Sequence, residues 1–322
     1  MLTIDLNENK QLVIIEKYDL TPKDQQVLIK VHASAVNRAD LLQRKGLYPP
    51  PVGDSDILGL EAAGEIVAVG DGVSSKLLGK RVMALCAGGG YGEYVCVHYE
   101  HCIDLPPSYS YEMGAGFCEV FFTAFDALRQ SPEFGRPHTL LVHAGASGVG
   151  TAAIILAKRL GARVVATVGN QAKREACEAL GADVVINYKE HNWCDYLKAQ
   201  DIKIDLVIDP IAGEYIRQDI EVMAMDGTIV ILAMLGGRYC EKLDMAKVLA
   251  KRVRVIGSTL RNRSISYKSK LVQDLTSQFG PEIQQGLIKP VIDSIYSWRD
   301  VEQAHQRLEN NENIGKVILQ HD

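Results

Sequence analysis

The segment HAGASGVGTAAIILAKRLGARVVATVG, residues 143–169, decides the fold class of this chain. It follows the apolar run Thr139–Val142 and carries glycines at positions 145 and 150 ahead of small and aliphatic residues. A buried strand, a glycine-rich turn and a helix of small residues, in that order, are typical of a dinucleotide-binding βα unit. We therefore predict that the turn binds a pyrophosphate at the N-terminus of the following helix, where backbone N–H groups are free.

The turn departs from the usual pattern at one position. Ser147 stands where the middle glycine of Gly-x-Gly-x-x-Gly normally lies, so the spacing reads Gly145-x-Ser147-x-x-Gly150. Gly145 is expected to permit the tight turn, and Gly150 to let the helix pack closely on the strand. A small hydroxyl can donate its own hydrogen bond to a phosphate oxygen, so we expect the replacement to preserve binding.

The pattern of strand and helix repeats beyond this segment. Two helices are predicted, Ala152–Leu160 and Ala172–Leu180, and each is stopped by a glycine. Further strand-like runs alternate with helical stretches, at Val164–Val168, Leu206–Asp209, Thr228–Leu232 and Val253–Ile256. This alternation predicts a doubly wound parallel sheet.

The two ends of the chain have a different pattern of predicted strands and helices. From Leu2 to Leu105 short runs such as Val27–Val31 and Ala63–Val69 are bounded by Gly, Pro and Asp, which predicts an all-β, barrel-like domain. After Arg261 come amphipathic helices and a last strand, Lys316–Leu319. The 322 residues suffice for two cores, so we expect an α/β protein with two domains.

Composition narrows the class of partner. The net charge of −5 argues against nucleic acid, because phosphate binding needs a basic surface. The sequence has neither an apolar run of membrane-spanning length nor a basic-then-apolar leader. The seven cysteines, at 86, 96, 102, 118, 177, 194 and 240, include no CxxC pair and are odd in number. A cytoplasmic enzyme with reduced thiols is the expectation.

The residues after the second strand of the βα repeat predict the choice of cofactor. An NAD-preferring site usually places a carboxylate there to bind the ribose hydroxyls. Here Gly169 and Asn170 follow Val168 instead, and Lys173 comes shortly after. Nothing repels a 2′-phosphate, and Lys173 can pair with it, so NADPH is favoured. The alternative is that Lys173 is an ordinary solvated charge on the next helix.

The chain also resembles a known family. The resemblance lies in VHASAVNRADLLQRKGLYPPP, LGLEAAGEIVAVG, FFTAFDAL, the turn segment quoted above and NIGKVIL. These motifs are similar to the zinc-free quinone oxidoreductases of the medium-chain dehydrogenase/reductase superfamily, and to the tumour-suppressor-inducible subfamily in particular. The resemblance implies a GroES-like catalytic domain, residues 1–118 and 260–322, around a Rossmann NADPH-binding domain, residues 119–259. It also implies a homodimer through the sheet edge at Val253–Ser258.

The same resemblance implies site residues. It puts Asn37 beside the nicotinamide and Tyr48 at the acceptor, as a hydrogen-bond donor or an orienting group. Asp40 is expected to anchor these residues from behind, in preference to the alternative role of proton donor. Further cofactor contacts are implied for Thr123 at the ribose, for Ser147, Gly148 and Val149 along the pyrophosphate, for Gly169, Lys173 and Tyr188 around the 2′-phosphate, and for Leu235, Leu260 and Asn311 at its flanks. The alternative for Tyr48 is a ring that merely packs on Pro49-Pro50-Pro51.

A metal is not expected. Where zinc-dependent relatives carry a Cys, a His and a second Cys as ligands, this chain has Asn37, Leu60 and Glu119. A leucine cannot ligate, and one carboxylate is not a zinc site. The segment Cys96-Val-His98-Tyr-Glu-His101-Cys102 contains four potential ligands. Cys96 and His98 share one face of a predicted strand, but His101 and Cys102 fall outside that alternation, so a strand edge with scattered polar groups is favoured over a metal site.

Hydride transfer without a Lewis acid suits an acceptor that is already electron-poor. A quinone fits best, and NADPH:quinone reduction is the leading hypothesis. The second hypothesis is an enone or enoyl-thioester reductase, for which Arg261, Arg263, Lys268 and Lys270 would form a basic rim. The third is a cofactor-binding structural or RNA-binding protein, against which the acidic charge counts.

Overall fold

The computed structural model describes residues 1–131, 134 and 138–322. It divides into two compact units, one formed by Met1–Phe122 with Leu260–Asp322 and the other by Thr123–Thr259. We call them the barrel unit and the Rossmann unit. The chain crosses between them at 122/123, inside helix α3 (Cys118–Leu128), and at 259/260, whereas the predicted domains divide at 118/119 and 259/260.

The Rossmann unit is built on a six-stranded sheet whose strand order is β10-β9-β8-β11-β12-β13 and whose pairings are all parallel. The strands are β8 (Thr139–Val142), β9 (Arg163–Val168), β10 (Val184–Asn187), β11 (Ile204–Asp209), β12 (Met223–Ile231) and β13 (Arg254–Gly257). This is the order of a dinucleotide-binding sheet, in which the turn after the first strand, β8, opens at the point where the order reverses.

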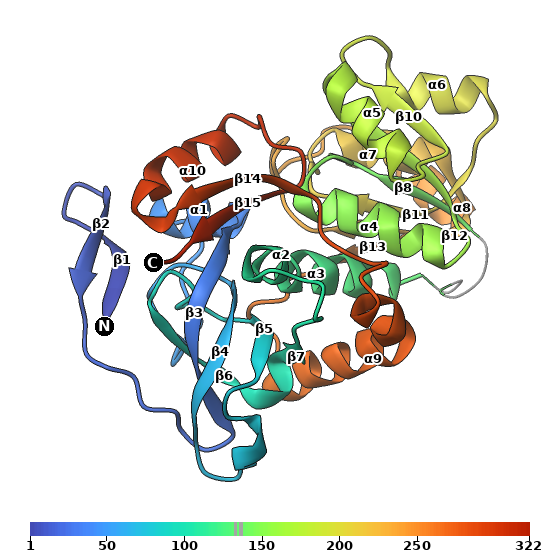
Figure 1. Cartoon of the computed structure of the whole chain (residues 1–322). Coiled ribbons are helices and arrows are strands. Elements are labelled where there is room, and N and C mark those ends of the chain that lie inside the picture. The colour runs from blue at the N-terminus through green and yellow to red at the C-terminus, as the bar shows by residue number, and fades with distance from the viewer. Residues whose placement is uncertain (132–133, 135–137) are drawn as a thin grey trace. The chain divides into compact units, whose positions relative to one another are not determined.

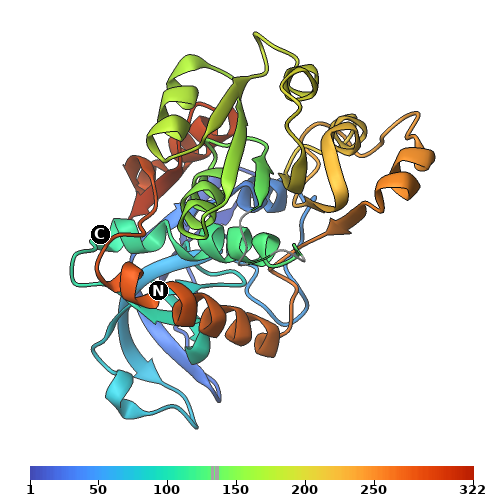
Figure 2. The same ribbon diagram turned by 90° about the vertical axis from the view of Figure 1, so that its right-hand side faces the viewer.

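Helices cover both faces of this sheet (Figures 1 and 2). They are α4 (Gly148–Arg159), α5 (Gln171–Ala179), α6 (Trp193–Ala199), α7 (Tyr215–Val222) and α8 (Met245–Lys251). The apolar core on the α6 and α7 side joins Leu141 and Val165 of the sheet to Trp193 and Ile220 of these helices. Both predicted helices exist, and each ends before a glycine in the left-handed region, Gly161 or Gly181.

A buried histidine fixes the start of the glycine turn. The Nε2 atom of His143 lies 2.8 Å from Asp219 Oδ1 on α7, and its Nδ1 lies 2.9 Å from Thr167 Oγ1 on β9. The rings of Trp193 and Tyr215 contact it edge-on. Because both nitrogens have partners, the ring ties the end of β8 to β9 and to α7.

The barrel unit contains a seven-stranded sheet of order β14-β15-β3-β4-β5-β7, with β6 also paired to β3, and a separate β1–β2 hairpin. The strands are β1 (Leu2–Leu6), β2 (Leu12–Glu16), β3 (Gln26–Val36), β4 (Glu61–Val69), β5 (Arg81–Leu85), β6 (Tyr94–His98), β7 (Cys102–Asp104), β14 (Ile292–Ser297) and β15 (Lys316–Gln320). The C-terminal strand β15 runs antiparallel beside the end of β3, so both ends of the chain contribute to one sheet (Figure 1).

Four α-helices lie within the barrel unit, namely α1 (Arg38–Arg44), α2 (Tyr111–Ala115), α9 (Ile265–Gln284) and α10 (Val301–Glu309). Its core includes Val27, Ile29 and Ile66 from β3 and β4. The predicted fold class, a GroES-like β domain with a Rossmann domain, is confirmed. Within the described residues, no helix has the length and apolarity needed to cross a membrane.

Candidate functional site

The glycine turn of the Rossmann unit opens a helix with a serine cap. Ser147 is the N-cap of α4, and its Oγ accepts a hydrogen bond of 3.0 Å from the backbone N–H of Gly150. The hydroxyl hydrogen is left to donate elsewhere. Gly148 and Val149, the first helical residues, are half-exposed and have no intrahelical acceptor for their N–H groups. The turn therefore presents several donors to an anion, and the binding of a pyrophosphate there stays a prediction.

The glycines of the turn are needed for close packing. A Cβ on Gly150 would lie 2.5 Å from the carbonyl oxygens of Ala144 and Gly145, and one on Gly145 would lie 2.8 Å from Ala166 Cβ on β9. The residue with a positive φ is Ala144, at 53°. We expected Gly145 to permit the tight turn. In the structure Gly145 instead allows β9 to pack closely against the turn, and Ala144 is the residue that adopts the left-handed conformation.

The residues predicted around the 2′-phosphate lie together at the carboxyl ends of β9 and β10. A Cβ on Gly169 would lie 2.6 Å from Tyr188 Oη, so the tyrosine covers this glycine. Lys173 lies in the first turn of α5, and its backbone N–H donates to the side chain of the N-cap Asn170. Parallel strands bring their carboxyl ends to one edge of a sheet, and Ser147 follows β8 at this edge too.

The other predicted cofactor contacts are spread more widely. In the Rossmann unit Thr123 is half-buried on α3, and Leu235 is exposed after β12. In the barrel unit Leu260 is buried, and the side chain of Asn311 accepts a hydrogen bond of 2.7 Å from Arg38 Nη2. These four residues stay predictions.

The barrel unit contains a buried ammonium group, that of Lys316. Lys316 Nζ on β15 donates to the Val36 carbonyl (3.2 Å), to Asn37 Oδ1 (2.5 Å) and to Glu61 Oε1 on β4 (2.8 Å). The side chains of Lys316 and Glu61 are 3% and 1% exposed. All three N–H bonds of the ammonium therefore have acceptors, which is what a buried charge requires.

This cluster fixes Asn37. Its Nδ2 donates 3.0 Å to Glu61 Oε1 while its Oδ1 accepts from Lys316. Its backbone N–H donates 2.7 Å to Asp40 Oδ2 at the start of α1. The amide is thereby held from both of its polar ends, so its orientation follows from the ion pair beneath it.

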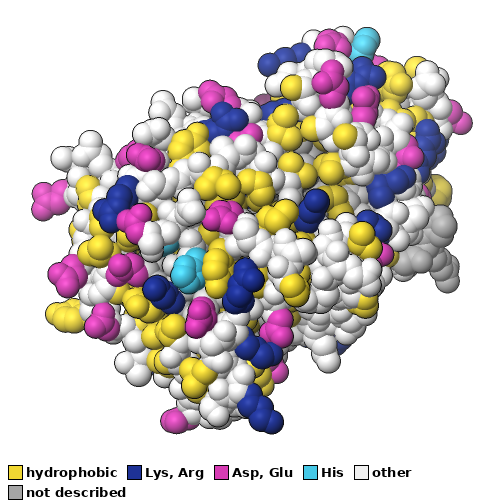
Figure 3. Space-filling model, in the orientation of Figure 1, with side chains coloured by type: hydrophobic (Ala, Val, Ile, Leu, Met, Phe, Trp, Pro, Cys, Tyr) yellow, Lys and Arg dark blue, Asp and Glu magenta, His cyan; other side chains and the backbone are white. Residues whose placement is uncertain are grey.

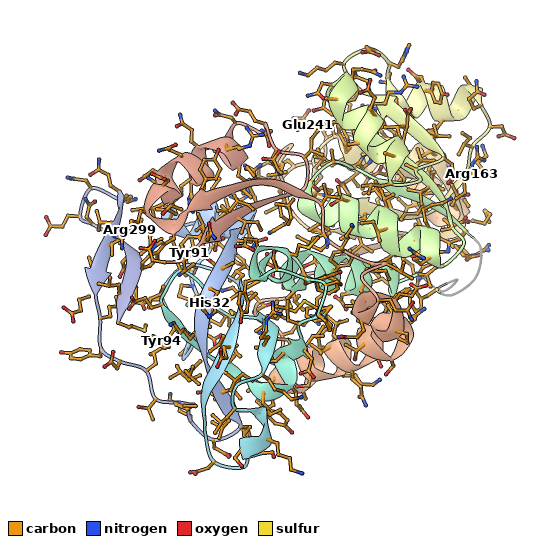
Figure 4. The ribbon with its side chains drawn as sticks, viewed as in Figure 1. His32, Tyr91, Tyr94, Arg163, Glu241 and Arg299 are labelled. Carbon is orange, nitrogen blue, oxygen red and sulfur yellow. The ribbon has the colours of Figure 1, made fainter. Side chains whose placement is uncertain are left out.

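Asp40 is completely buried among protein partners. Besides the Asn37 N–H, it accepts from the Gly59 N–H (3.1 Å) and from Tyr91 Oη (3.3 Å), and the tyrosine also contacts His305 Nε2 at 2.9 Å. Tyr91 is labelled in Figure 4. Burial raises the pKa of Asp40 to about 6, although the two backbone donors oppose this. Its contacts are those of an anchor for Asn37, the role implied for it above.

A hydrogen bond from its backbone N–H fixes the position of Glu119 at the start of α3. Its N–H donates 2.9 Å to Glu61 Oε2. Burial, followed by the negative charge of Glu61, raises the pKa of the Glu119 carboxyl to about 8. At neutral pH this carboxyl is therefore protonated and uncharged.

Tyr48 lies beside an arginine. Its ring is half-buried, and Arg261 Cζ lies 5.6 Å from the ring centroid. Arg261 Nε donates 2.7 Å to the Ala87 carbonyl. Burial, and then the nearby Glu119, raises the pKa of the Tyr48 phenol, so the hydroxyl remains a donor at neutral pH.

The polar side chains around Asn37 do not suit zinc. Leu60 is a buried hydrocarbon, and the ammonium of Lys316 occupies the space between Asn37 and Glu61, where it would repel a metal cation. Among the residues that the structure describes, no group of three or more His, Cys, Asp or Glu side chains is arranged to hold a metal.

The four basic residues that would form a phosphate-binding rim in an enoyl-thioester reductase are not all exposed. Arg261 and Lys268 are only 5% and 6% exposed. Lys270 pairs with Asp274, and Arg263 lies over the Tyr267 ring. Two of the four cations are therefore inside the barrel unit and do not form an exposed phosphate-binding rim.

Several residues of this cluster were missed in the sequence, above all Lys316, Glu61 and Tyr91. A signal was present, because Glu61 and Lys316 are single charges within the apolar runs LGLEAAG and NIGKVIL. A lone charge in a buried strand indicates a buried partner. Its identity depends on the strand order, which the sequence does not give directly.

Comparison with known proteins agrees with this architecture. Residues 23–107 match the alcohol dehydrogenase GroES-like domain, and residues 148–277 match the zinc-binding dehydrogenase family. Human quinone oxidoreductase is 32% identical over 303 residues, which cover 92% of this chain and 90% of the human protein.

Two solved structures are similar over nearly the whole chain. A mycobacterial protein complexed with NADPH has a TM-score of 0.86 at 26% identity, covering 99% of this chain and 100% of that chain. An NAD-dependent alcohol dehydrogenase has a TM-score of 0.84 at 28% identity, covering 99% of both. The chain is an oxidoreductase that uses a nicotinamide cofactor, and it belongs to the quinone oxidoreductases of the medium-chain dehydrogenase/reductase superfamily.

Proposed function

We propose that this enzyme transfers hydride from NADPH to a quinone without a metal. The observation that carries the proposal is the Lys316–Glu61–Asn37 cluster, in which an ammonium stands where a zinc ion would need ligands. A donor set of this kind supplies no Lewis acid, so the acceptor must be electron-poor before it binds. The family supports the same substrate class, since the human relative is a quinone oxidoreductase.

The cofactor supplies the hydride, and the protein binds and orients both reactants. The donors of the α4 turn bind the pyrophosphate, and Gly169, Lys173 and Tyr188 surround the 2′-phosphate. Asn37, held by Lys316 and Asp40, orients the nicotinamide. Tyr48 donates a hydrogen bond to the acceptor. One quinone, one NADPH and one proton give hydroquinone and NADP⁺.

The competing activities have less support. Burial of Arg261 and Lys268 removes half of the rim that an enoyl-thioester enzyme would use for phosphates. A small enone remains the alternative acceptor. For the RNA-binding hypothesis, the face seen in Figure 3 carries acidic and basic side chains interspersed, without a basic stripe. NADPH oxidation measured with quinones, enones and enoyl thioesters tests the proposal, and turnover of only the thioesters would refute it.

The enzyme works as a homodimer in the cytoplasm. Strand β13 is the edge of the Rossmann sheet, and its Val255 is 45% exposed. A second copy paired along this edge would cover both its backbone groups and the exposed side chain of Val255. All seven cysteines are free thiols, which suits a reducing compartment.

The cofactor preference is tested at Lys173. Loss of one charge-assisted contact costs roughly 1.5–3 kcal/mol, so Lys173→Ala should weaken NADPH binding about tenfold or more and leave NADH binding nearly unchanged. Titration of cofactor fluorescence measures both affinities. Lys198→Ala removes an exposed cation on α6 and is the control. Equal losses for the two cofactors would mean that Lys173 acts through folding.

The role of Tyr48 is tested by two substitutions. Tyr48→Phe keeps the ring and removes the donor, so turnover with a benzoquinone should fall by roughly tenfold to a hundredfold. The loss should be larger with an enone, which needs more electrophilic help. NADPH affinity and melting temperature should stay the same. If only Tyr48→Ala impairs the enzyme and Tyr48→Phe is fully active on both acceptors, the ring serves packing alone.

The pH dependence is tested at Glu119. Because its pKa is raised to about 8, this carboxyl is neutral below that pH and ionises above it. The added carboxylate near Tyr48 then opposes the negative charge that hydride brings to the acceptor, so kcat/KM should fall as pH rises through about 8. Glu119→Gln should abolish this decline, whereas Glu112→Gln on α2 should not. A decline that persists in Glu119→Gln would assign it to another group.

The dimer is tested at the sheet edge. Val255→Lys places a charge in the proposed contact, so the mass in solution should change from that of a dimer to that of a monomer. Light scattering after size exclusion measures it. Val67→Lys, at a residue that is 40% exposed on β4 of the barrel unit, is the matched control. A native protein of monomeric mass would refute the dimer outright.

A further inference from the structure

The guanidinium of Arg261 is buried with most of its donors unused. The residue is 5% exposed, and Nε donates to the Ala87 carbonyl. Both terminal nitrogens, Nη1 and Nη2, are inaccessible to solvent and have no hydrogen-bond partner among the described residues. Buried donors of this kind are costly, so they are rare in folded proteins and call for an explanation.

A second buried cation lies beside Arg261. Lys268 Nζ is also buried and donates 2.7 Å to the Arg261 carbonyl oxygen. Within the described residues, neither cation forms an ion pair. Of the nearby carboxyls, Asp40 is engaged by Asn37, Gly59 and Tyr91, and Glu119 is protonated at neutral pH. Asp54 is exposed to solvent. Within the described residues, no carboxylate therefore forms a hydrogen bond with the terminal nitrogens of Arg261.

The position of this charge connects it to the acceptor. The guanidinium lies over the ring of Tyr48, the residue to which the proposed function assigns contact with the acceptor. Hydride transfer adds two electrons and one hydrogen to a quinone, and negative charge appears on a quinone oxygen before a solvent proton completes the hydroquinone. Donors that are fixed in advance around such an oxygen stabilise the transition state more than the ground state.

We propose that Arg261 is a catalytic residue whose free Nη1 and Nη2 groups donate hydrogen bonds to the oxygen that becomes negative in the acceptor. Lys268 strengthens this site by its charge. The ligand class is an oxyanion attached to a conjugated ring or alkene, such as a hydroquinone anion or an enolate. The inference rests on the proposed function, since it names the group that makes quinones and enones suitable acceptors.

The first experiment needs neither cofactor nor turnover. 4-Nitrophenol serves as a probe for the hydroquinone anion, and its absorbance reports its ionisation when bound. The wild-type protein should lower the pKa of bound 4-nitrophenol below the free value, and Arg261→Gln should restore the free value. Arg261→Lys keeps a positive charge and should retain part of the shift. Arg299→Gln removes an exposed arginine that pairs with Asp322, and it should behave as the wild type.

The second experiment measures rates. For Arg261→Gln, kcat/KM should fall by roughly tenfold to a thousandfold with a benzoquinone and further with an enone, with NADPH affinity unchanged. Arg261→Lys should lie between this variant and the wild type. It also serves as the informative variant if Arg261→Gln does not fold, because it preserves the buried charge.

The outcomes separate this inference from the proposed function. Full activity and an unshifted probe pKa in both Arg261 variants would overturn the inference. A matching loss of NADPH affinity, without a change in the probe, would overturn it too, since Arg261 would then serve the cofactor. If the wild type reduces neither quinones nor enones but the probe pKa depends on Arg261, the oxyanion site stands and the proposed function fails.

Discussion

The buried ammonium of Lys316 is the contact on which the arrangement of the barrel unit depends. It joins the C-terminal strand β15 to the end of β3, to Asn37 and to Glu61 of β4. Through the second oxygen of Glu61 it also reaches the first turn of α3. Loss of one member of a buried ion pair leaves an uncompensated charge and typically costs about 3–5 kcal/mol. One side chain thus couples the two ends of the chain to the residue that orients the nicotinamide in our proposal.

The same contact sets the electrostatics of the proposed acceptor site. Lys316 and Glu61 neutralise each other, and the remaining effect of Glu61 on Glu119 is to favour its protonated form. Arg261 is a buried positive charge over the ring of Tyr48, and Lys268 is a second one that contacts the Arg261 carbonyl oxygen. A site of this kind favours charge that arises on the acceptor during the reaction, which is the task that a zinc ion performs in metal-dependent enzymes.

Each unit supports its candidate site residues with hydrogen bonds between buried polar groups. In the Rossmann unit His143, Thr167 and Asp219 hold the strand that leads into the cofactor turn. In the barrel unit Asp40 and Tyr91 hold the backbone of Asn37. Such support limits the motion of the groups that contact ligands, because the supporting rotamers are locked by packing. Arg261 differs in that both of its terminal nitrogens lack a hydrogen-bond partner among the described residues.

The sequence alone determined the strand, turn and helix around residues 139–160, because these elements are local and Gly150 is demanded by backbone contacts within the segment. It also determined the absence of a carboxylate after β9. Only the tertiary structure decided which charges are buried and which groups they contact. Lys316 forms a hydrogen bond with Asn37, which is 279 positions away in the sequence. Arg261 contacts the ring of Tyr48 because the C-terminal part of the chain packs on the barrel. The physical reason is that burial and partner choice depend on strand order and register, which arise from packing between distant segments.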